Sequence, residues 1–132
     1  MLPQDMAHAM AVDVSSQRAM ETFARQVQKQ FGVPDVVVNN AGIGMAGSFL
    51  NTSVKDWQKV LGVNVWGVLH ASRLFAQQRI DAGKRGHIVN TASAAAYTPS
   101  RVYPAYATSK AAVLMLSDCL QAELAEEDIG VT

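Results

Sequence analysis

Short apolar runs alternate along the chain with longer stretches in which apolar residues recur every three or four positions. Residues 9–13 form the first short run, and a stretch of helical spacing follows it, containing Met20, Phe23, Val27 and Phe31. Ser15 or Ser16 can cap this helix, and Gly32 can end it. This alternation predicts βα units and a parallel sheet.

Two later runs have the composition of buried strands. Val36, Val37 and Val38 are consecutive β-branched residues, which is typical of a strand buried on both faces. They lead into Asn39-Asn40-Ala41-Gly42 and a loop rich in glycine and serine. Residues 87–93 form the second such run, and residues 130–132 resemble the start of a third strand.

Two long helical patterns complete the chain. Residues 53–81 are too many for one uncapped helix, so we expect a break at Gly62 or Gly67. Residues 105–127 predict a last helix, with Val113, Leu116, Leu120 and Leu124 on its apolar side. Both helices carry apolar residues outside the single face that would pack against the sheet, among them Trp66 and Met115. A helix that is apolar on more than one side must be buried on more than one side, so we expect these residues to contact a second subunit. The alternative is that further segments of the same chain cover these residues.

Composition narrows the possible functions. The 132 residues suit one domain, and 49% apolar against 17% charged residues is typical of a folded globular protein. Eleven basic residues balance eleven acidic ones without clustering, so we expect no binding to nucleic acid or to a membrane surface. The three histidines lack ligand spacing, and we expect no metal site.

The cellular setting follows from what the chain contains. Cys119 is the single cysteine and lies among leucines, so it is interpreted as a core thiol in a reducing compartment. Residues 1–14 lack the basic start and apolar run of a signal peptide. The most apolar stretch, residues 60–69, is shorter than the roughly 20 residues of a membrane span. We therefore expect a soluble, cytoplasmic protein.

The strongest chemical signal is the pair Tyr106 and Lys110. On a helix, side chains four residues apart share a face, with Cβ atoms about 5–6 Å apart. A lysine cation so close favours the ionised phenol, which could then exchange a proton with an alcohol or a carbonyl near neutral pH. By itself this spacing occurs by chance in many helices.

Two further polar residues accompany this pair. Ser93 is the last residue of a predicted strand, at the edge where open α/β sheets place ligands, and its hydroxyl can donate to a substrate oxygen. Asn64 interrupts an apolar helical run and must find hydrogen-bond partners there. It could equally serve only in packing.

These motifs together resemble the short-chain dehydrogenase/reductase family. Asn39-Asn40-Ala41-Gly42, Asn64-Val65-Trp66-Gly67, the strand from residue 88 to residue 93 and Tyr106-x-x-x-Lys110 occur in the family's order and spacing. The resemblance extends over essentially the whole chain. It implies an α/β fold, a Rossmann-like doubly wound parallel sheet that is incomplete here, with residues 1–132 forming part of one such domain.

The resemblance also implies a catalytic tetrad of Asn64, Ser93, Tyr106 and Lys110. Tyr106 would be the general acid/base, and Lys110 would favour its ionised form and hold the nicotinamide ribose. Ser93 would bind the substrate oxygen, and Asn64 would hold a water that connects Lys110 to solvent. The cofactor, NAD or NADP, would exchange hydride with a secondary alcohol or ketone.

Other cofactor contacts follow by the same resemblance. Asp13 and Val14 correspond to adenine contacts, and Asn40, Ala41 and Gly42 to the wall beside the adenosine ribose. Asn39 and Asn40 could instead serve mainly to join neighbouring strands. Tyr97 and Tyr103, between Ser93 and Tyr106, could line a substrate pocket.

Part of the family pattern has no counterpart. The glycine-rich turn that binds the cofactor pyrophosphate is absent, as are the first two strands and the C-terminal strands of the family sheet. In the order 3-2-1-4-5-6 the missing strands would lie between residues 9–13 and the valine strand, which predicts a gap in the sheet. We therefore interpret the sequence as a partial domain.

Two functions remain open at this point. The first is an NAD(P)-dependent oxidoreductase that acts as a homodimer or homotetramer on a small alcohol or carbonyl substrate. The second is a catalytically inert Rossmann-fold module used for binding or assembly, or an inactive piece of a larger enzyme. The four tetrad residues favour the first, and the missing phosphate-binding loop favours the second.

Overall fold

Three parallel strands form the sheet in the computed structural model, which describes residues 6–132. These are β1 (Val36–Asn39), β2 (Gly86–Asn90) and β3 (Ile129–Val131), in the order β1-β2-β3. Val37 lies opposite Ile88, and Ile88 lies opposite Val131. The predicted parallel sheet is thereby confirmed, including the strand that starts near residue 130. Residues 1–5, part of the segment in which we predict no signal peptide, lie outside the described residues.

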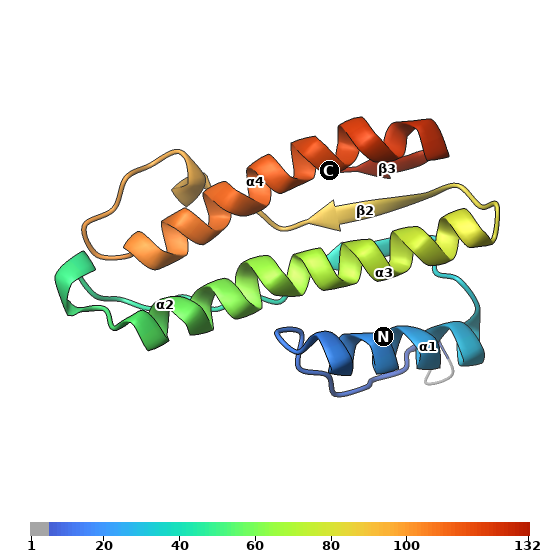
Figure 1. The fold of residues 1–132 in the computed structure, drawn as a ribbon, viewed down its shortest axis with the longest axis horizontal. Helices are drawn as coiled ribbons and strands as arrows, with labels where there is room; N and C mark the ends of the chain where they lie inside the picture. The colour runs from blue at the N-terminus through green and yellow to red at the C-terminus, as the bar shows by residue number, and fades with distance from the viewer. Residues whose placement is uncertain (1–5) are drawn as a thin grey trace.

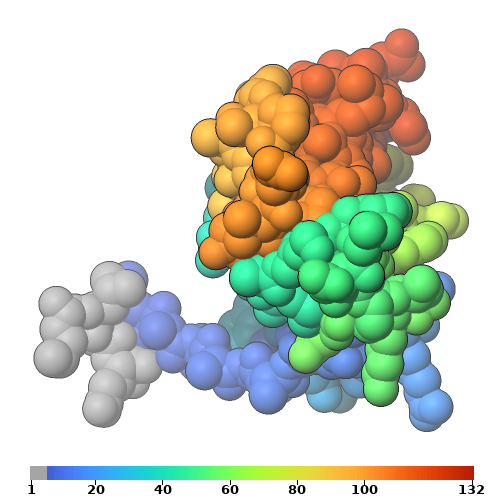
Figure 2. All heavy atoms as spheres, turned by 90° about the vertical axis from the view of Figure 1, so that its left-hand side faces the viewer, coloured from blue at the N-terminus to red at the C-terminus, as the bar shows by residue number. Residues whose placement is uncertain are grey.

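Four α-helices accompany the sheet: α1 (Gln17–Phe31), α2 (Val54–Leu61), α3 (Gly67–Asp81) and α4 (Pro104–Leu124). Short 3-10 turns occur at Phe49–Asn51, Ala94–Ala96 and Ala125–Glu127. Helices α1, α3 and α4 form a layer in front of the strands (Figure 1). Figure 2 faces the end of the molecule at which the yellow-orange loop after β2 lies above the green loop before α2. The last predicted helix, residues 105–127, is confirmed as α4 with its 3-10 turn.

The ends of α1 are set by local capping. Ser16 is the N-cap, and its side chain accepts a hydrogen bond from the amide of Ala19 at 3.3 Å. At the other end Gly32 has φ +83°, a conformation that suits glycine, and its amide donates to the carbonyl of Gln28. The predicted helix and both of its limits are confirmed.

The core lies between the sheet and the helices, in two clusters. One cluster joins the three strands to α3 and α4, and consists of Ala76, Ile88, Leu124, Ile129 and Val131. The second joins α1 to α3, and consists of Met20, Ala24, Ala71 and Phe75. Val37 packs against both. Full burial of a large apolar side chain stabilises a fold by about 1.5–3 kcal/mol, so the partly buried Val37 adds to the pairing of β1 with β2.

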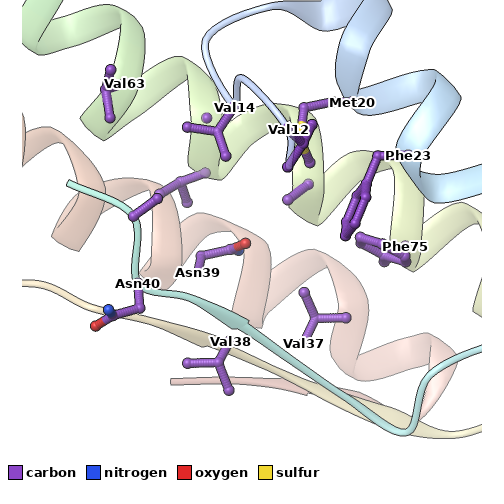
Figure 3. A pocket seen from close by; sticks show the side chains of 14 residues that line it. Val12, Val14, Met20, Phe23, Val37, Val38, Asn39, Asn40, Val63 and Phe75 are labelled. Atoms are coloured by element: carbon purple, nitrogen blue, oxygen red, sulfur yellow. The ribbon is translucent and has the colours of Figure 1, made fainter. Parts of the chain in front are cut away.

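The expectation that β1 is buried on both faces is wrong. Val37 faces the helices, whereas Val36 is 55% exposed and Val38 is 60% exposed. Neighbouring side chains of a strand project to opposite faces, as Val37 and Val38 do in Figure 3. No element within residues 6–132 covers the second face of β1, so its apolar residues remain at the surface there.

The expected division of the long pattern into two helices at Gly62 or Gly67 is confirmed, because α2 ends at Leu61 and α3 begins at Gly67, but the chain is not broken between them. A π-helical segment, Gly62–Trp66, joins α2 to α3 without interruption. Both glycines have right-handed helical dihedral angles, and the amide of Gly67 donates to the carbonyl of Gly62, five residues earlier. The two glycines therefore mark the limits of a π bulge, and such bulges are frequent at functional sites.

Residues 9–13 do not form the predicted strand. A strand needs a hydrogen-bonded neighbour, and in the described sheet β1 is an edge strand with only β2 beside it. An apolar pocket of about 200 Å³ lies between this segment and β1, with Val12 and Val14 on one side and Val37 on the other (Figure 3). It corresponds to the gap that the sequence predicts.

Cys119 is exposed, so its interpretation as a core thiol is wrong. It follows Ser117, which points toward the sheet, by two residues. Two residues are about 200° around an α-helix, and this places the thiol on the opposite side of α4. Within residues 6–132, no helix combines the length and the apolar character needed to cross a bilayer.

Candidate active site

A cavity of about 620 Å³ lies where the chain leaves the carboxyl ends of β1 and β2. The loop after β1 and the loop after β2 form its walls, and the start of α4 forms its floor. The lining residues are Asn40, Gly42, Ile43, Gly44, Thr91, Ala94, Ala95, Thr98, Ser100, Tyr103, Tyr106 and Lys110. The amide of Gly47 donates to the carbonyl of Val102 at 2.8 Å and ties the two loops together.

Tyr106 and Lys110 both face this cavity from α4, as their spacing predicts. Pro104 occupies the first position of the helix, where its missing N–H costs nothing, and this fixes the start of α4. The Nζ atom of Lys110 lies 5.8 Å from the centre of the Tyr106 ring. It donates to the carbonyl of Thr91 at 2.5 Å.

Lys110 is a buried cation, only 5% exposed. Burial of a charge is costly unless the charge is paired or fully hydrogen-bonded. Of the residues described, Arg79 and Asp35 form the single ion pair, so no carboxylate neutralises Lys110. Lysine is rarely so deeply buried without such a partner, so its position calls for a specific reason.

Asn64 is fully buried in the π segment, and its amide is engaged on both sides. Oδ1 accepts from the amide of Ile43 at 2.8 Å, and Nδ2 donates to the carbonyl of Ile43 at 2.9 Å. The second Nδ2 hydrogen is donated to Oγ of Ser109, also at 2.9 Å. Asn64 thus finds the partners that its burial requires.

Ser93 lies just beyond the end of β2 and is the N-cap of the turn Ala94–Ala96. Its Oγ accepts from the amide of Ala95 at 3.2 Å, which leaves its own hydrogen to donate. Ser93 is not one of the cavity-lining residues, although Ala94 and Ala95 are. Of the two tyrosines considered for the pocket, Tyr103 lines the cavity and Tyr97 does not.

The predicted cofactor residues divide into two groups. Asn40 and Gly42 line the cavity with Tyr106 and Lys110, and Asn40 accepts at Oδ1 from the hydroxyl of Thr91 at 3.2 Å. Ala41 lines only the apolar pocket beside β1, whereas Asn40 lines both that pocket and the cavity. A Cβ atom at Gly42 would lie 3.7 Å from Nζ of Lys110, so the glycine leaves that space open.

Asp13 and Val14 lie away from the cavity. The Asp13 carboxylate accepts from the hydroxyl of Ser15 at 2.7 Å and from its amide at 3.0 Å, and these two bonds lower the pKa of the Asp13 carboxyl. Val14 packs on the backbone of Gly67 and lines the apolar pocket. The structure does not bring either residue together with Tyr106.

Several polar residues of this region were not singled out from the sequence. Ser109 and Thr91 contact the tetrad directly. Beneath the cavity, Asn39 donates to Ser72 at 3.0 Å and to Asn90 at 2.8 Å, and Asn90 donates to Ser117 at 2.9 Å. This is the strand-joining role considered for Asn39. The serines at apolar positions of α3 and α4 were the available signal, because a buried hydroxyl needs a partner.

Metal chemistry has no assembled ligand set here. In the part of the chain that the structure describes, no three His, Cys, Asp or Glu side chains come close enough to hold an ion. The polar side chains that line the cavity are those of asparagine, threonine, serine, tyrosine and lysine.

The sequence is similar to known proteins over nearly its whole length. A sequence profile described as short chain dehydrogenase matches residues 2–132. "Probable oxidoreductase EphD" of Mycobacterium tuberculosis is 50% identical over 127 residues, which is 96% of this chain and 22% of that protein. The 2,3-dihydro-2,3-dihydroxybenzoate dehydrogenase of Bacillus subtilis is 36% identical, over 93% of this chain and 47% of that protein.

Solved structures agree with these relatives. A short chain dehydrogenase/reductase from Burkholderia phymatum in complex with NAD is 34% identical, with a TM-score of 0.89 over 93% of this chain and 44% of that one. A metagenomic short-chain oxidoreductase in complex with NADP is 32% identical, with a TM-score of 0.89 over 96% of this chain and 56% of that one. The chain thus spans about half of these structures and less than half of the relatives named above. It belongs to the short-chain dehydrogenase/reductase family.

Proposed function

We propose that the complete protein containing these residues is an NAD(P)-dependent oxidoreductase that interconverts a secondary alcohol and a ketone. One observation carries the proposal: Tyr106 and Lys110 face the same cavity, and Lys110 is a buried cation without a carboxylate partner. A phenol beside such a cation is suited to proton exchange with an alcohol oxygen.

The residues of the cavity fit a nicotinamide cofactor. Lys110 uses one of its N–H donors on Thr91, and the others are available for ribose hydroxyls. Gly42 and Gly44 leave the wall beside Lys110 and Tyr106 without side chains, which gives a flat group room to approach. Family members of known structure are in complex with NAD or with NADP, and both remain candidates.

The chemical roles follow from the groups present. A bound nicotinamide would supply or accept the hydride. Tyr106 would donate a proton to the ketone oxygen, or take it from the alcohol, while Lys110 stabilises the phenolate that remains. Ser93 would donate its hydroxyl hydrogen to the same substrate oxygen, because its Oγ already accepts from Ala95.

The remaining predicted roles belong to the same proposal. Asn64 would hold a water at its remaining Oδ1 lone pair, linking Lys110 to solvent. Asn40, Ala41 and Gly42 would line the ribose side of the cofactor. Asp13 and Val14 would contact its adenine, which requires the cofactor to extend from the cavity across the edge of β1.

The rival function is an inert binding or assembly module of the same fold. Cofactor binding and turnover separate the two. The complete protein would be titrated with NADH and with NADPH, and nicotinamide fluorescence would be followed. We expect saturable binding of at least one of them, and oxidation of that cofactor on addition of a suitable ketone. Saturable binding of neither would contradict the proposal and favour the inert module.

We also propose that the protein forms a homodimer or homotetramer through α3 and α4, in the cytoplasm. A groove of about 400 Å³ between these helices is lined by Leu69, Ala76, Ile80, Leu116, Leu120 and Leu124 with polar neighbours. Trp66, at the end of the π segment just before α3, is 54% exposed, and Met115 of α4 is 63% exposed. A symmetric pairing of the two helices with their copies would cover these side chains.

A further inference from the structure

Ser109 is a buried hydroxyl that lies between Tyr106 and Lys110 in the sequence. Its side chain has no exposed surface. Its Oγ donates to the carbonyl of Tyr106 at 2.6 Å and accepts from Nδ2 of Asn64 at 2.9 Å. One hydroxyl therefore joins the first turns of α4 to the π segment before α3.

The connection continues from Asn64 to the opposite wall of the cavity. Asn64 binds both backbone groups of Ile43, the amide at 2.8 Å and the carbonyl at 2.9 Å. Ile43 lies in the loop after β1 and lines the cavity. The hydrogen-bonded series Tyr106–Ser109–Asn64–Ile43 thus spans from the helix that carries the proposed base to the facing loop.

The spacing between these two walls is small. A Cβ atom at Gly44 would lie 3.9 Å from Cδ2 of Tyr106, and one at Gly42 would lie 3.7 Å from Nζ of Lys110. The same atom at Gly42 would lie 3.5 Å from Oδ1 of Asn64. Any rotation of the Asn64 amide would therefore move the loop relative to both functional side chains.

Loss of the Ser109 hydroxyl would cause such a rotation. It would leave one Nδ2 hydrogen of Asn64 buried without an acceptor, which is costly in a dry interior. The amide can relieve this cost only by turning, and turning weakens its two bonds to Ile43. Displacement of reacting groups by about 1 Å can lower a rate by about 10²-fold.

We propose that Ser109 is a positioning residue, which fixes the loop around Ile43 relative to Tyr106 and Lys110 through Asn64. This rests on the proposed oxidoreductase function. Ser109 is not one of the residues that line the cavity. Its influence on the reaction would therefore pass through its hydrogen bond with Asn64.

The chain offers a closely matched control on the same helix. Ser117 also accepts from an asparagine Nδ2, that of Asn90 at 2.9 Å, and donates to the carbonyl of Val113 at 2.8 Å. It lies about two turns further along α4, and neither Ser117 nor its partner Asn90 lines the cavity. Removal of either hydroxyl breaks one hydrogen bond with an asparagine side chain and one with a backbone carbonyl of α4. Only the asparagine bonded to Ser109 is also bonded to the loop around Ile43.

The test compares Ser109→Ala with Ser117→Ala in the complete protein, measuring kcat, KM for the cofactor and thermal midpoint. We expect the midpoint to fall in both variants, and further in Ser109→Ala, because the Ser109 hydroxyl is fully buried and that of Ser117 is only partly buried. We also expect kcat at least about 10-fold lower for Ser109→Ala, against less than about 2-fold for Ser117→Ala. Equal kcat values for the two variants would overturn the positioning role while leaving the proposed function intact.

Two further outcomes are defined. Ser109→Cys keeps the size of the side chain with a weaker acceptor, so it should fold even if Ser109→Ala does not, and its kcat should fall by about 3-fold or more. A wild-type kcat in Ser109→Cys would overturn the proposal. No cofactor turnover in the unmodified protein would overturn the proposed function, and the positioning role with it.

Discussion

Lys110 is the residue whose surroundings are hardest to explain by packing alone. It is buried, its ammonium donates to a backbone carbonyl of Thr91, and the nearest ring is that of Tyr106. A carbonyl neutralises a cation only in part, so the protein keeps this charge at a cost to its stability. We infer that the charge is retained for its action on the phenol and on the cofactor.

Lys110→Met is expected to impair two properties together. Methionine keeps most of the side-chain volume and removes the charge and the donors. We expect turnover to fall by at least about 10²-fold and cofactor affinity to weaken by about 10-fold, measured by steady-state rates and nicotinamide fluorescence. Lys55→Met, at an exposed position of α2, is the control and should change neither. Unchanged cofactor affinity in Lys110→Met would refute the ribose contact.

At this scale the sequence predicted the pair Tyr106 and Lys110 because helical spacing is regular, and both do face the cavity. It could not predict the partners of Asn64. These are a backbone segment 21 residues earlier and a serine 45 residues later, and only the folded chain brings them together. Exposure of Cys119 was missed for a related reason, since neighbouring leucines do not determine which side of a helix a residue occupies.

The π segment is the feature of the elements that matters most for the site. It lies between α2 and α3 and carries Asn64 toward the loop after β1. The sequence indicated an irregularity at its two glycines but not its kind, because a π bulge and a chain break both tolerate glycine. Gly67 has a specific reason to lack a side chain, which is its contact with Val14.

Two glycine substitutions separate these roles. A Cβ atom at Gly67 would lie 2.9 Å from Cγ2 of Val14, whereas one at Gly62 would lie 3.6 Å from Cβ of Ser15, an ordinary contact. We expect Gly67→Ala to destabilise the protein by about 1–3 kcal/mol. Gly62→Ala should be neutral or stabilising by up to about 1 kcal/mol, because alanine favours helix. Urea unfolding midpoints measure the change in stability of each variant. An equal loss of stability in Gly67→Ala and Gly62→Ala would contradict the contact with Val14.

The strands show that an apolar run in the sequence does not by itself determine whether a strand forms. β2 and β3 formed, because each finds a parallel neighbour within the chain, but β2 ends at Asn90 and not at Ser93 as expected. Residues 9–13 have a similar composition and remain irregular, since β1 does not pair with them. Burial of β1 on one face only has the same origin. Strand formation depends on partners elsewhere in the sequence, which composition does not reveal.

The molecule as a whole has one covered and one uncovered face. The helices pack on one side of the sheet (Figure 1). Val36 and Val38 of β1 are exposed on the other side. Together with the apolar pocket beside β1, this matches the partial domain that the family resemblance implies. The chain spans about a fifth of the relative that is 50% identical to it.

Assembly is the prediction that belongs to this scale. Light scattering on the complete protein at micromolar concentration should give the mass of a dimer or tetramer. Leu116→Glu places a charge in the groove between α3 and α4 and should shift the mass toward the monomer. Cys119→Ser, at an exposed position of the same helix, should leave it unchanged. A strict monomer before any substitution would contradict the proposed contact and would indicate that other segments cover this groove.

The central claim is that Tyr106 exchanges the proton of the reaction, and Tyr106→Phe tests it most directly. Phenylalanine keeps the ring that packs near Gly44 and removes only the hydroxyl. The measurement is kcat in the complete protein with its preferred nicotinamide cofactor, alongside cofactor affinity from fluorescence. The account predicts that kcat falls by at least about 10²-fold while the affinity stays within about 2-fold of the original value. Turnover close to that of the unmodified protein would contradict it.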